Sequence, residues 1–227
     1  TTGVTTGATA LTITADAASG NLTVDAAALA DNTALTLSGG ANGKTATVNN
    51  LAGDLVATGL VSALTVNLVD NAGDDDISVT TGSHTTSITG SISGDTVSVI
   101  ATALADDAVL STAGAGAFTI TDLKGDLNNT ATGAVSVTLA DNAGGTYTVT
   151  SDQAITVVNG TAATGDTITL AGIGTKTVTG LVANLSLDAS NTGTTGVTTG
   201  ATALTITADA LAGNLTVDAA ALADNTA

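Results

Sequence analysis

The sequence predicts an all-β fold, an elongated parallel β-solenoid in which successive coils of chain stack on one another. Three observations predict it: a vocabulary of strand and turn residues, short strands at close spacing, and internal repeats on several length scales. A row of tandem β-sandwich repeats is the alternative that the same strands allow.

The composition favours strands and turns. The 227 residues include 48 Thr and 27 Gly, and all 20 acidic residues are Asp. Thr and Val suit the pleated strand, whereas Asp, Asn and Gly suit turns. Hydrophobic residues make up 43%, yet there is one Phe, one Tyr and no Trp, Met, Pro or Cys. We therefore expect a thin core of aliphatic side chains.

Short apolar–polar–apolar triplets recur along the whole chain, and many neighbours lie 8 to 13 residues apart. Each has the period-two alternation of a strand with one buried face. They begin at Leu11, Leu22, Leu35, Leu64, Ile77, Val97, Phe118, Val135, Tyr147, Ile155, Ile168, Leu185, Leu204 and Leu215.

The longest repeat has a period of 193 residues. Residues 1–34 return at 194–227, with differences only at Ala18/Leu211 and Ser19/Ala212. We expect the sequence to be a window on a longer array of such units.

A weaker repeat divides the long one. Residues 50–55, Asn-Leu-Ala-Gly-Asp-Leu, resemble residues 122–127 and, more loosely, residues 180–185. Residues 94–99 resemble 165–170, and residues 28–32 resemble 103–107. The expected modules of about 60 to 70 residues are 1–45 (the end of one module), 46–117, 118–176 and 177–227 (the start of the next).

The solenoid is preferred over tandem sandwiches for three reasons. Sandwich cores usually hold a large aromatic residue, tandem domains usually show linkers, and graded similarity suits an array in which each coil contacts its neighbours. One segment conflicts with the strand pattern: residues 25–30 have helical propensity, which predicts either a short helical turn or a strand imposed by its neighbours.

The charge limits the partners. The net charge is −17, with only Lys44, Lys124 and Lys176 as cations. Nucleic acid is excluded, because phosphate binding needs clustered Lys or Arg. No run approaches the length of a membrane span, so membrane insertion is not expected.

Catalysis is not expected either. His84 is the only His, and its polar segment, residues 81–86, predicts an exposed turn. Paired carboxylates would need a pocket, for which a thin rod offers no evident place. We therefore predict that the protein is not an enzyme and requires no cofactor.

Calcium is the one ligand that the sequence supports. Asp70, Asp74, Asp75 and Asp76 lie within seven residues, and Ca²⁺ prefers six to eight oxygen ligands. The alternative is a solvated turn with Asx caps. Weaker candidates of the same kind are Asp95, Asp106, Asp107, Asp141 and Asp166.

Threonine pairs raise a further alternative. Thr12/Thr14, Thr148/Thr150 and Thr167/Thr169 have the Thr-x-Thr spacing that could order water on a flat face and bind ice. Irregular strand spacing and interrupting Asp residues weigh against it, and strand propensity explains these residues equally well.

Three segments, residues 22–34, 94–99 and 118–127, carry a resemblance that covers essentially the whole chain. The sequence resembles giant repetitive bacterial surface proteins, the beta-strand-repeat and calcium-toxin-repeat (RTX-type) adhesins and surface-layer proteins. The resemblance implies secretion, display at the cell surface, and a role in adhesion, biofilm or a protective layer.

The functional expectation is an extracellular structural or adhesive segment that forms a stiff fibre, spacer or surface coat. Its expected partner is itself, through adjacent repeats and through lateral or end-to-end assembly. The alternative is a calcium-dependent adhesin module that binds a cell-surface or matrix ligand.

Overall fold

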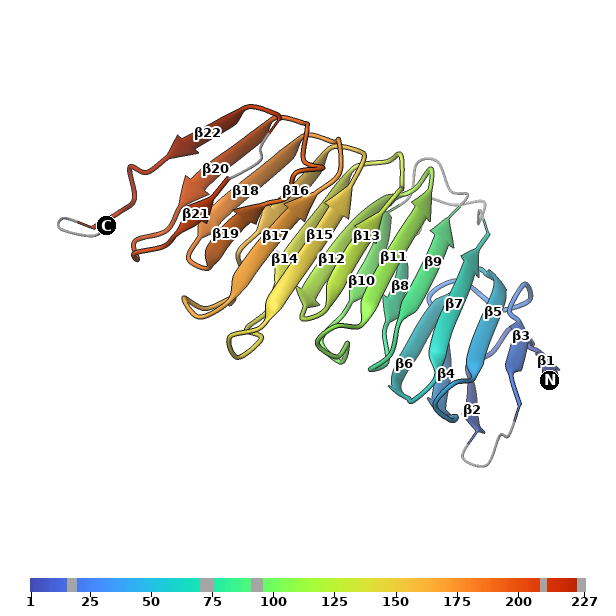
Figure 1. The fold of residues 1–227 in the computed structure, drawn as a ribbon. Coiled ribbons are helices and arrows are strands. Elements are labelled where there is room, and N and C mark those ends of the chain that lie inside the picture. The colour runs from blue at the N-terminus through green and yellow to red at the C-terminus, as the bar shows by residue number, and fades with distance from the viewer. Residues whose placement is uncertain (16–19, 70–75, 91–95, 209–211, 224–227) are drawn as a thin grey trace.

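The computed structural model describes the chain apart from residues 16–19, 70–75, 91–95, 209–211 and 224–227. Within that part, every regular element is a β-strand, so it contains no helix that could cross a membrane. The 22 strands form two sheets of 11, and successive strands alternate between the sheets. Figure 1 shows the coils stacked in sequence order, with the termini at opposite ends of the stack. The predicted parallel β-solenoid is confirmed.

The odd sheet holds the odd-numbered strands in sequence order. They are β1 (Thr2–Thr5), β3 (Leu22–Asp25), β5 (Thr45–Leu51), β7 (Ala63–Leu68), β9 (Thr86–Gly90), β11 (Val109–Gly114), β13 (Asp126–Asn129), β15 (Thr146–Ser151), β17 (Thr167–Ala171), β19 (Asn184–Leu187) and β21 (Ile206–Thr207).

The even sheet holds the others in the same order. They are β2 (Leu11–Ala15), β4 (Ala34–Gly39), β6 (Asp54–Leu60), β8 (Ile77–Thr80), β10 (Thr96–Ile100), β12 (Ala117–Leu123), β14 (Val135–Leu139), β16 (Ile155–Val158), β18 (Lys176–Leu181), β20 (Thr195–Thr199) and β22 (Leu215–Asp218).

Each strand pairs in parallel with the strand two positions further along the chain. The length of chain per coil varies: Leu110 pairs with Leu127, 17 residues on, whereas Leu22 pairs with Ala46, 24 residues on. In the shorter coil the corners are residues 115–116 and 124–125, whereas in the longer coil they are residues 26–33 and 40–44, so the corners account for this variation. Irregular corners are therefore why the repeat is blurred in the sequence.

The core lies between the two sheets as columns of small aliphatic side chains. Val24, Val48 and Val66 occupy one column of the odd sheet and are completely buried. Phe118 and Tyr147 are also buried within the stack. A gap of about 10 Å between packed sheets is filled by aliphatic side chains without many aromatic residues, as the composition indicates.

The short repeat at 50–55, 122–127 and 180–185 forms three short corners, at residues 52–53, 124–125 and 182–183. In each copy a strand of one sheet leads within a few residues into the next strand of the other sheet: β5 into β6, β12 into β13, and β18 into β19. The first residue of each copy, Asn50, Asp122 or Gly180, has a positive φ of 54°, 55° or 66°. A β-bulge falls at the same place, which re-aims the chain.

The glycine of this motif sits over a turn of the preceding coil. A Cβ on Gly53 would lie 2.7 Å from the Ala30 carbonyl oxygen, and a Cβ on Gly125 would lie 2.8 Å from that of Ala105. Residues 28–32 and 103–107, which the sequence shows as a second repeat, are these turns. The two repeated motifs therefore stack on each other.

The segment of helical propensity, residues 25–30, forms a turn and not a helix. The Leu29 N–H donates to the Ala26 carbonyl over 3.1 Å, and both residues are buried. A second turn follows in the same corner, where the Thr33 N–H donates to the Ala30 carbonyl over 3.1 Å before β4 begins.

Candidate functional site

The predicted calcium loop is described at one residue only. Asp70, Asp74 and Asp75 lie outside the described residues, and Asp76 lies inside them. The Asp76 Oδ1 accepts a hydrogen bond of 3.2 Å from the Thr96 N–H, on the neighbouring coil. In the described structure, Asp76 therefore joins two strands of the even sheet.

Asp76 belongs to a repeated arrangement that we call the strand-start caps. In each, an Asp or Asn at the start of a strand accepts the N–H of the residue directly opposite on the next coil. The pairs are Asn21 with Thr45 (3.2 Å), Asp54 with Ser78 (2.9 Å), Asp76 with Thr96 (3.2 Å), Asp126 with Thr148 (2.7 Å) and Asn184 with Thr205 (3.0 Å). Each cap supplies an acceptor between coils where the regular ladder begins.

The strand-start caps were not predicted, because Asp and Asn were interpreted only as turn or metal residues. The signal was present: three of the five caps stand between a Gly and a Leu, in the sequence Gly-(Asp/Asn)-Leu. The caps lie at the start of a strand because the short side chain of Asp or Asn can reach the opposite N–H on the next coil from that position.

Three of the weaker calcium candidates lie near one corner. Asp106 Oδ1 accepts from Asn142 Nδ2 over 2.7 Å, and Asp141 Oδ1 accepts from the Ala143 N–H over 2.9 Å. Asp166 is described next. Asp107 has a positive φ of 62° in its own turn, and Asp95 lies outside the described residues.

Asp166 is completely buried, and its oxygens receive donors from the protein. Its Oδ1 accepts from the Gly144 N–H over 2.7 Å, and its Oδ2 accepts from the Ala163 N–H over 2.8 Å. The Tyr147 hydroxyl lies 3.2 Å from Oδ2, and the Asn142 N–H adds a longer contact of 3.4 Å. Both oxygens are thus occupied in holding two corners together.

Tyr147 is the second member of this buried pair. Its hydroxyl also contacts the Ala140 carbonyl oxygen. Burial, followed by the negative charge of Asp166, raises the pKa of Tyr147 far above its usual value. The phenol therefore stays protonated and serves as a donor inside the core.

Among the residues that the structure describes, no group of three or more His, Cys, Asp or Glu side chains is placed to hold a metal ion. The Asp106, Asp141 and Asp166 carboxylates instead accept hydrogen bonds from amide and hydroxyl groups of the chain.

Lys176 was also missed by the sequence analysis, which treated it only as one of three cations. Its side chain is completely buried, and Nζ donates to the carbonyl oxygens of Ser151 (3.1 Å), Gly172 (2.5 Å) and Gly174 (2.9 Å). Burial lowers the pKa of Lys176, and the negative charge of Asp152 opposes that shift. The buried ammonium group thus joins the corner between β17 and β18 to Ser151 of β15.

A buried polar column crosses three coils of the odd sheet. Thr112 Oγ1 donates to Asn129 Oδ1 over 2.8 Å, and Asn129 Nδ2 donates to Ser151 Oγ over 2.9 Å. The Ser151 hydroxyl in turn donates to the Gln153 carbonyl over 2.9 Å. All three side chains are completely buried. A change of register would therefore leave buried polar groups without hydrogen-bond partners, which is costly because water cannot reach them.

His84 lies among other polar side chains. Its Nδ1 is 2.9 Å from Ser83 Oγ, and its Nε2 is 2.6 Å from Asn42 Oδ1. The ring thus ties two turns from distant parts of the sequence and has no carboxylate partner among these contacts.

The three threonine pairs do not form one array. Thr12 and Thr14 lie on β2 of the even sheet, whereas the pairs at 148/150 and 167/169 lie on β15 and β17 of the odd sheet. Only the last two pairs are neighbours, with Thr148 opposite Thr169.

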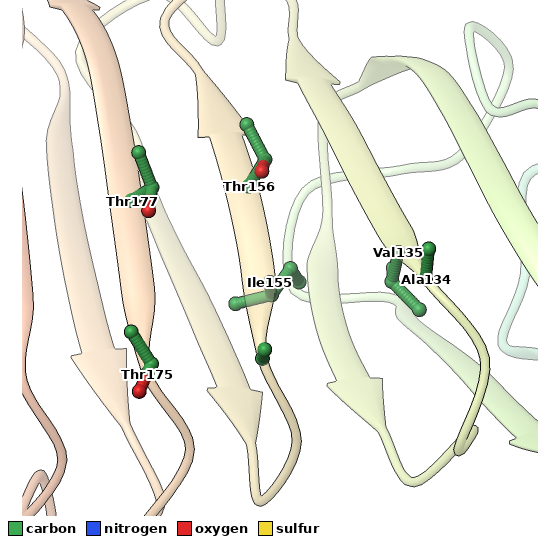
Figure 2. A pocket seen from close by; sticks show the side chains of 7 residues that line it. Ala134, Val135, Ile155, Thr156, Thr175 and Thr177 are labelled. Atoms are coloured by element: carbon green, nitrogen blue, oxygen red, sulfur yellow. The ribbon is translucent and has the colours of Figure 1, made fainter.

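A hollow of about 190 Å³ lies where β14, β16 and β18 begin (Figure 2). Its lining consists of Ala134, Val135, Ala154, Ile155, Thr156, Thr175 and Thr177. The lining offers methyl, hydroxyl and backbone groups but no ionisable side chain. It therefore holds no residue pair for acid–base chemistry.

The fold defines the chain as a two-sheet β-solenoid whose repeated polar residues join neighbouring coils. No family model, no curated protein and no solved structure matches the sequence.

Proposed function

We propose that this chain is a structural segment of an extracellular bacterial repeat protein, serving as a stiff spacer, fibre or surface coat. The observation that carries the proposal is the continuity of both sheets, since 11 strands in each follow one another in parallel and in sequence order. In a chain built this way each added coil lengthens the stack, so a longer sequence gives a longer rod.

Stiffness follows from where the bonds lie. Strand hydrogen bonds run along the stack, so bending it requires stretching them on one side. Buried side-chain bonds such as Asn129–Ser151 and Lys176–Ser151 add constraints between coils that slippage would break. The product is a rod rising about 4.8 Å per coil.

Three features support an extracellular location. The chain has no Cys, its net charge of −17 keeps it soluble and repels anionic membranes, and its motifs resemble those of bacterial surface proteins. We propose no catalysis for it, because its repeated residues act on neighbouring coils.

Antibodies raised against the folded chain test the proposal on the organism that makes it. We expect gold-labelled antibody to decorate intact cells outside the envelope, in extended lines or a continuous layer. Labelling that appears only after the cells are broken would contradict the extracellular role.

A further inference from the structure

The chain contains two Asn-Gly pairs, at residues 42–43 and 159–160, and the fold places them in opposite surroundings. In such a pair the backbone nitrogen of the glycine can attack the asparagine carboxamide, because glycine has no Cβ to obstruct the approach. The attack releases ammonia and converts the amide into an acid. Whether a pair reacts in the folded protein depends on how firmly its carboxamide and its backbone are held by other groups.

The pair at 42–43 lies in an exposed turn between β4 and β5. The Lys44 N–H donates to the Ala41 carbonyl over 3.1 Å, which closes the turn, and Gly43 has a positive φ of 74°. Both Asn42 and Gly43 are exposed. Apart from its chain neighbours, a Cβ on Gly43 would meet no atom within 4 Å, so the backbone here is not packed against another coil.

His84 presents a hydrogen-bond donor to the carboxamide of this pair. Its Nε2 lies 2.6 Å from Asn42 Oδ1, and because an amide oxygen can only accept, the ring donates Nε2–H. In the neutral ring, Nδ1 then accepts from the Ser83 hydroxyl, which lies 2.9 Å away. Ser83 thus supports the tautomer that donates to Asn42. The bond holds the carboxamide oxygen and not the nitrogen, which is the atom that must leave.

The contact depends on two long corners that flank a short one. Asn42 lies in the corner between β4 and β5, and His84 lies in the corner between β8 and β9. On the coil between them, the corner from β6 to β7 consists only of residues 61–62. The bond between His84 and Asn42 shows that the two long corners meet across the short one.

The pair at 159–160 is held in place by its surroundings. Asn159 is 2% exposed, and its Oδ1 accepts from two backbone N–H groups, over 2.8 and 3.0 Å. Its Nδ2 donates to the Ala162 carbonyl over 2.7 Å. A Cβ on Gly160 would lie 2.0 Å from the Leu139 carbonyl oxygen, so the backbone is packed on the preceding coil. Attack at this carboxamide would require its hydrogen bonds to break first.

We propose that Asn42 is a self-modification site, at which the Gly43 nitrogen attacks the Asn42 carboxamide while His84 stabilises the charge that develops on Oδ1. The Gly43 N–H gives its proton to solvent, its nitrogen forms a bond to Asn42 Cγ, and the carboxamide nitrogen takes up a proton and leaves as ammonia. Water then opens the cyclic imide at either carbonyl, which gives aspartate or isoaspartate at this position. A donor aimed at an oxygen that gains negative charge lowers the barrier to the attack.

The two products change the contact between the corners. Aspartate keeps an oxygen that accepts from His84 Nε2–H and adds a negative charge, so the hydrogen bond becomes charge-assisted. Isoaspartate instead adds a methylene group to the backbone of the turn that Ala41 and Lys44 close. The extent of conversion would record the age of the folded chain. This inference needs only the fold of these corners and does not depend on the proposed structural function.

The test follows both Asn-Gly pairs in the same molecule. The folded chain is kept in mildly alkaline buffer and digested at intervals, and mass spectrometry of the peptides measures the conversion of Asn42 and of Asn159. We expect Asn42 to convert at least about tenfold faster, since Asn159 must first give up hydrogen bonds worth about 1 kcal/mol each. In urea, which unfolds the chain and exposes both pairs, the two rates should agree within about twofold.

Two substitutions test the part played by His84. H84L removes the donor, and we expect it to slow the conversion of Asn42 about fivefold, as the loss of one hydrogen bond implies. H84Q retains an N–H donor and should restore most of the rate. Asn159 reports folding in the same samples, because its conversion would rise if a substitution unfolded the chain.

Equal conversion of Asn42 and Asn159 in the folded natural chain, including none at either, would overturn the proposed site. An unchanged rate at Asn42 in H84L, with Asn159 still protected, would overturn the assistance by His84.

Discussion

The Tyr147 hydroxyl lies 3.2 Å from Asp166 Oδ2, and both side chains are completely buried between the sheets. The two residues stand on adjacent coils, Tyr147 in β15 and Asp166 directly before β17. A carboxylate in this interior is tolerated because backbone N–H groups and a phenol satisfy it.

Replacing Asp166 by Asn tests whether that carboxylate holds the corner. D166N keeps the size of the side chain but turns an amide NH₂ toward the donors at Ala163 and Tyr147. We expect the free energy of unfolding to fall by about 2 kcal/mol, measured from urea unfolding curves. The matched control D141N, on an exposed residue of the same region, should change it by less than about 0.5 kcal/mol. Equal effects would contradict the role of Asp166.

The buried phenol of Tyr147 leads us to predict that the free energy of unfolding falls in alkaline solution. Its pKa in the folded state is raised above the ordinary value of 10.0, mainly by burial. Below a pH equal to this ordinary pKa, both the folded and the unfolded chain keep the phenol proton, and the free energy of unfolding does not depend on Tyr147 ionisation. Above it the unfolded chain loses the proton while the folded chain keeps it, so the free energy of unfolding falls as pH rises.

The measurement is the urea midpoint between about pH 9 and pH 12, for the natural chain and for Y147F. We expect the natural chain to lose stability more steeply above pH 10 than Y147F, and phenolate absorbance to appear only with unfolding. Parallel pH profiles for the two proteins would count against the buried phenol.

Lys176 provides a test of the buried ammonium. K176M keeps the length of the side chain and removes the donor to the Ser151, Gly172 and Gly174 carbonyls. We expect a loss of about 2 kcal/mol in the free energy of unfolding. K124M, on a partly exposed lysine, should be nearly neutral. A more stable K176M would show that the cost of burying the charge exceeds its hydrogen bonds.

The strand-start caps predict a difference between two substitutions at one residue. D126A removes the acceptor of the Thr148 N–H, whereas D126N retains an oxygen, as Asn21 and Asn184 do in their caps. We expect D126A to cost about 1 kcal/mol and to speed amide exchange at Thr148, while D126N stays close to the natural chain. Fast exchange at Thr148 in both variants would show that the carboxylate charge matters more than the acceptor.

Chelation separates the structural function from the calcium-dependent alternative. The structural account needs no ion, so we expect the same melting temperature in calcium and in chelator. A bound ion stabilises the folded state by mass action, so a fall of several degrees on chelation would favour the alternative. Replacing Asp74 and Asp75 by Asn would then show whether that loss involves the predicted loop.

Much of the fold could be predicted because it depends on local patterns. The triplets at Val135 and Ile155 became the parallel strands β14 and β16, and the scarcity of large aromatics agrees with a core built mainly of aliphatic side chains. The corner motif at 50–55 was visible as a repeat, but its structural role was not, since the bulge at Asn50 arises in the pairing of β5 with β7 on the following coil.

The polar contacts between coils were harder to predict because they join residues 17 to 42 positions apart at irregular intervals. Lys176 reaches Ser151, and Asn129 bonds to Thr112, and neither spacing can be read before the coil lengths are known. The first copy of the long repeat places residues 22–25 in the odd sheet as β3, whereas the second copy places residues 215–218 in the even sheet as β22. This difference could be predicted only by counting strands, for which every corner must be placed.

The most direct test of the stacked-coil account is a pair of disulfides that share one residue. Thr119 of β12 lies directly opposite Ser136 of β14 in the same sheet, whereas Asn128 of β13, the next strand in sequence, lies in the other sheet. We predict that T119C/S136C forms an intramolecular disulfide and that T119C/N128C does not. A disulfide in the second pair and none in the first would mean that consecutive strands fold back on each other as in a β-sandwich, and would contradict the solenoid.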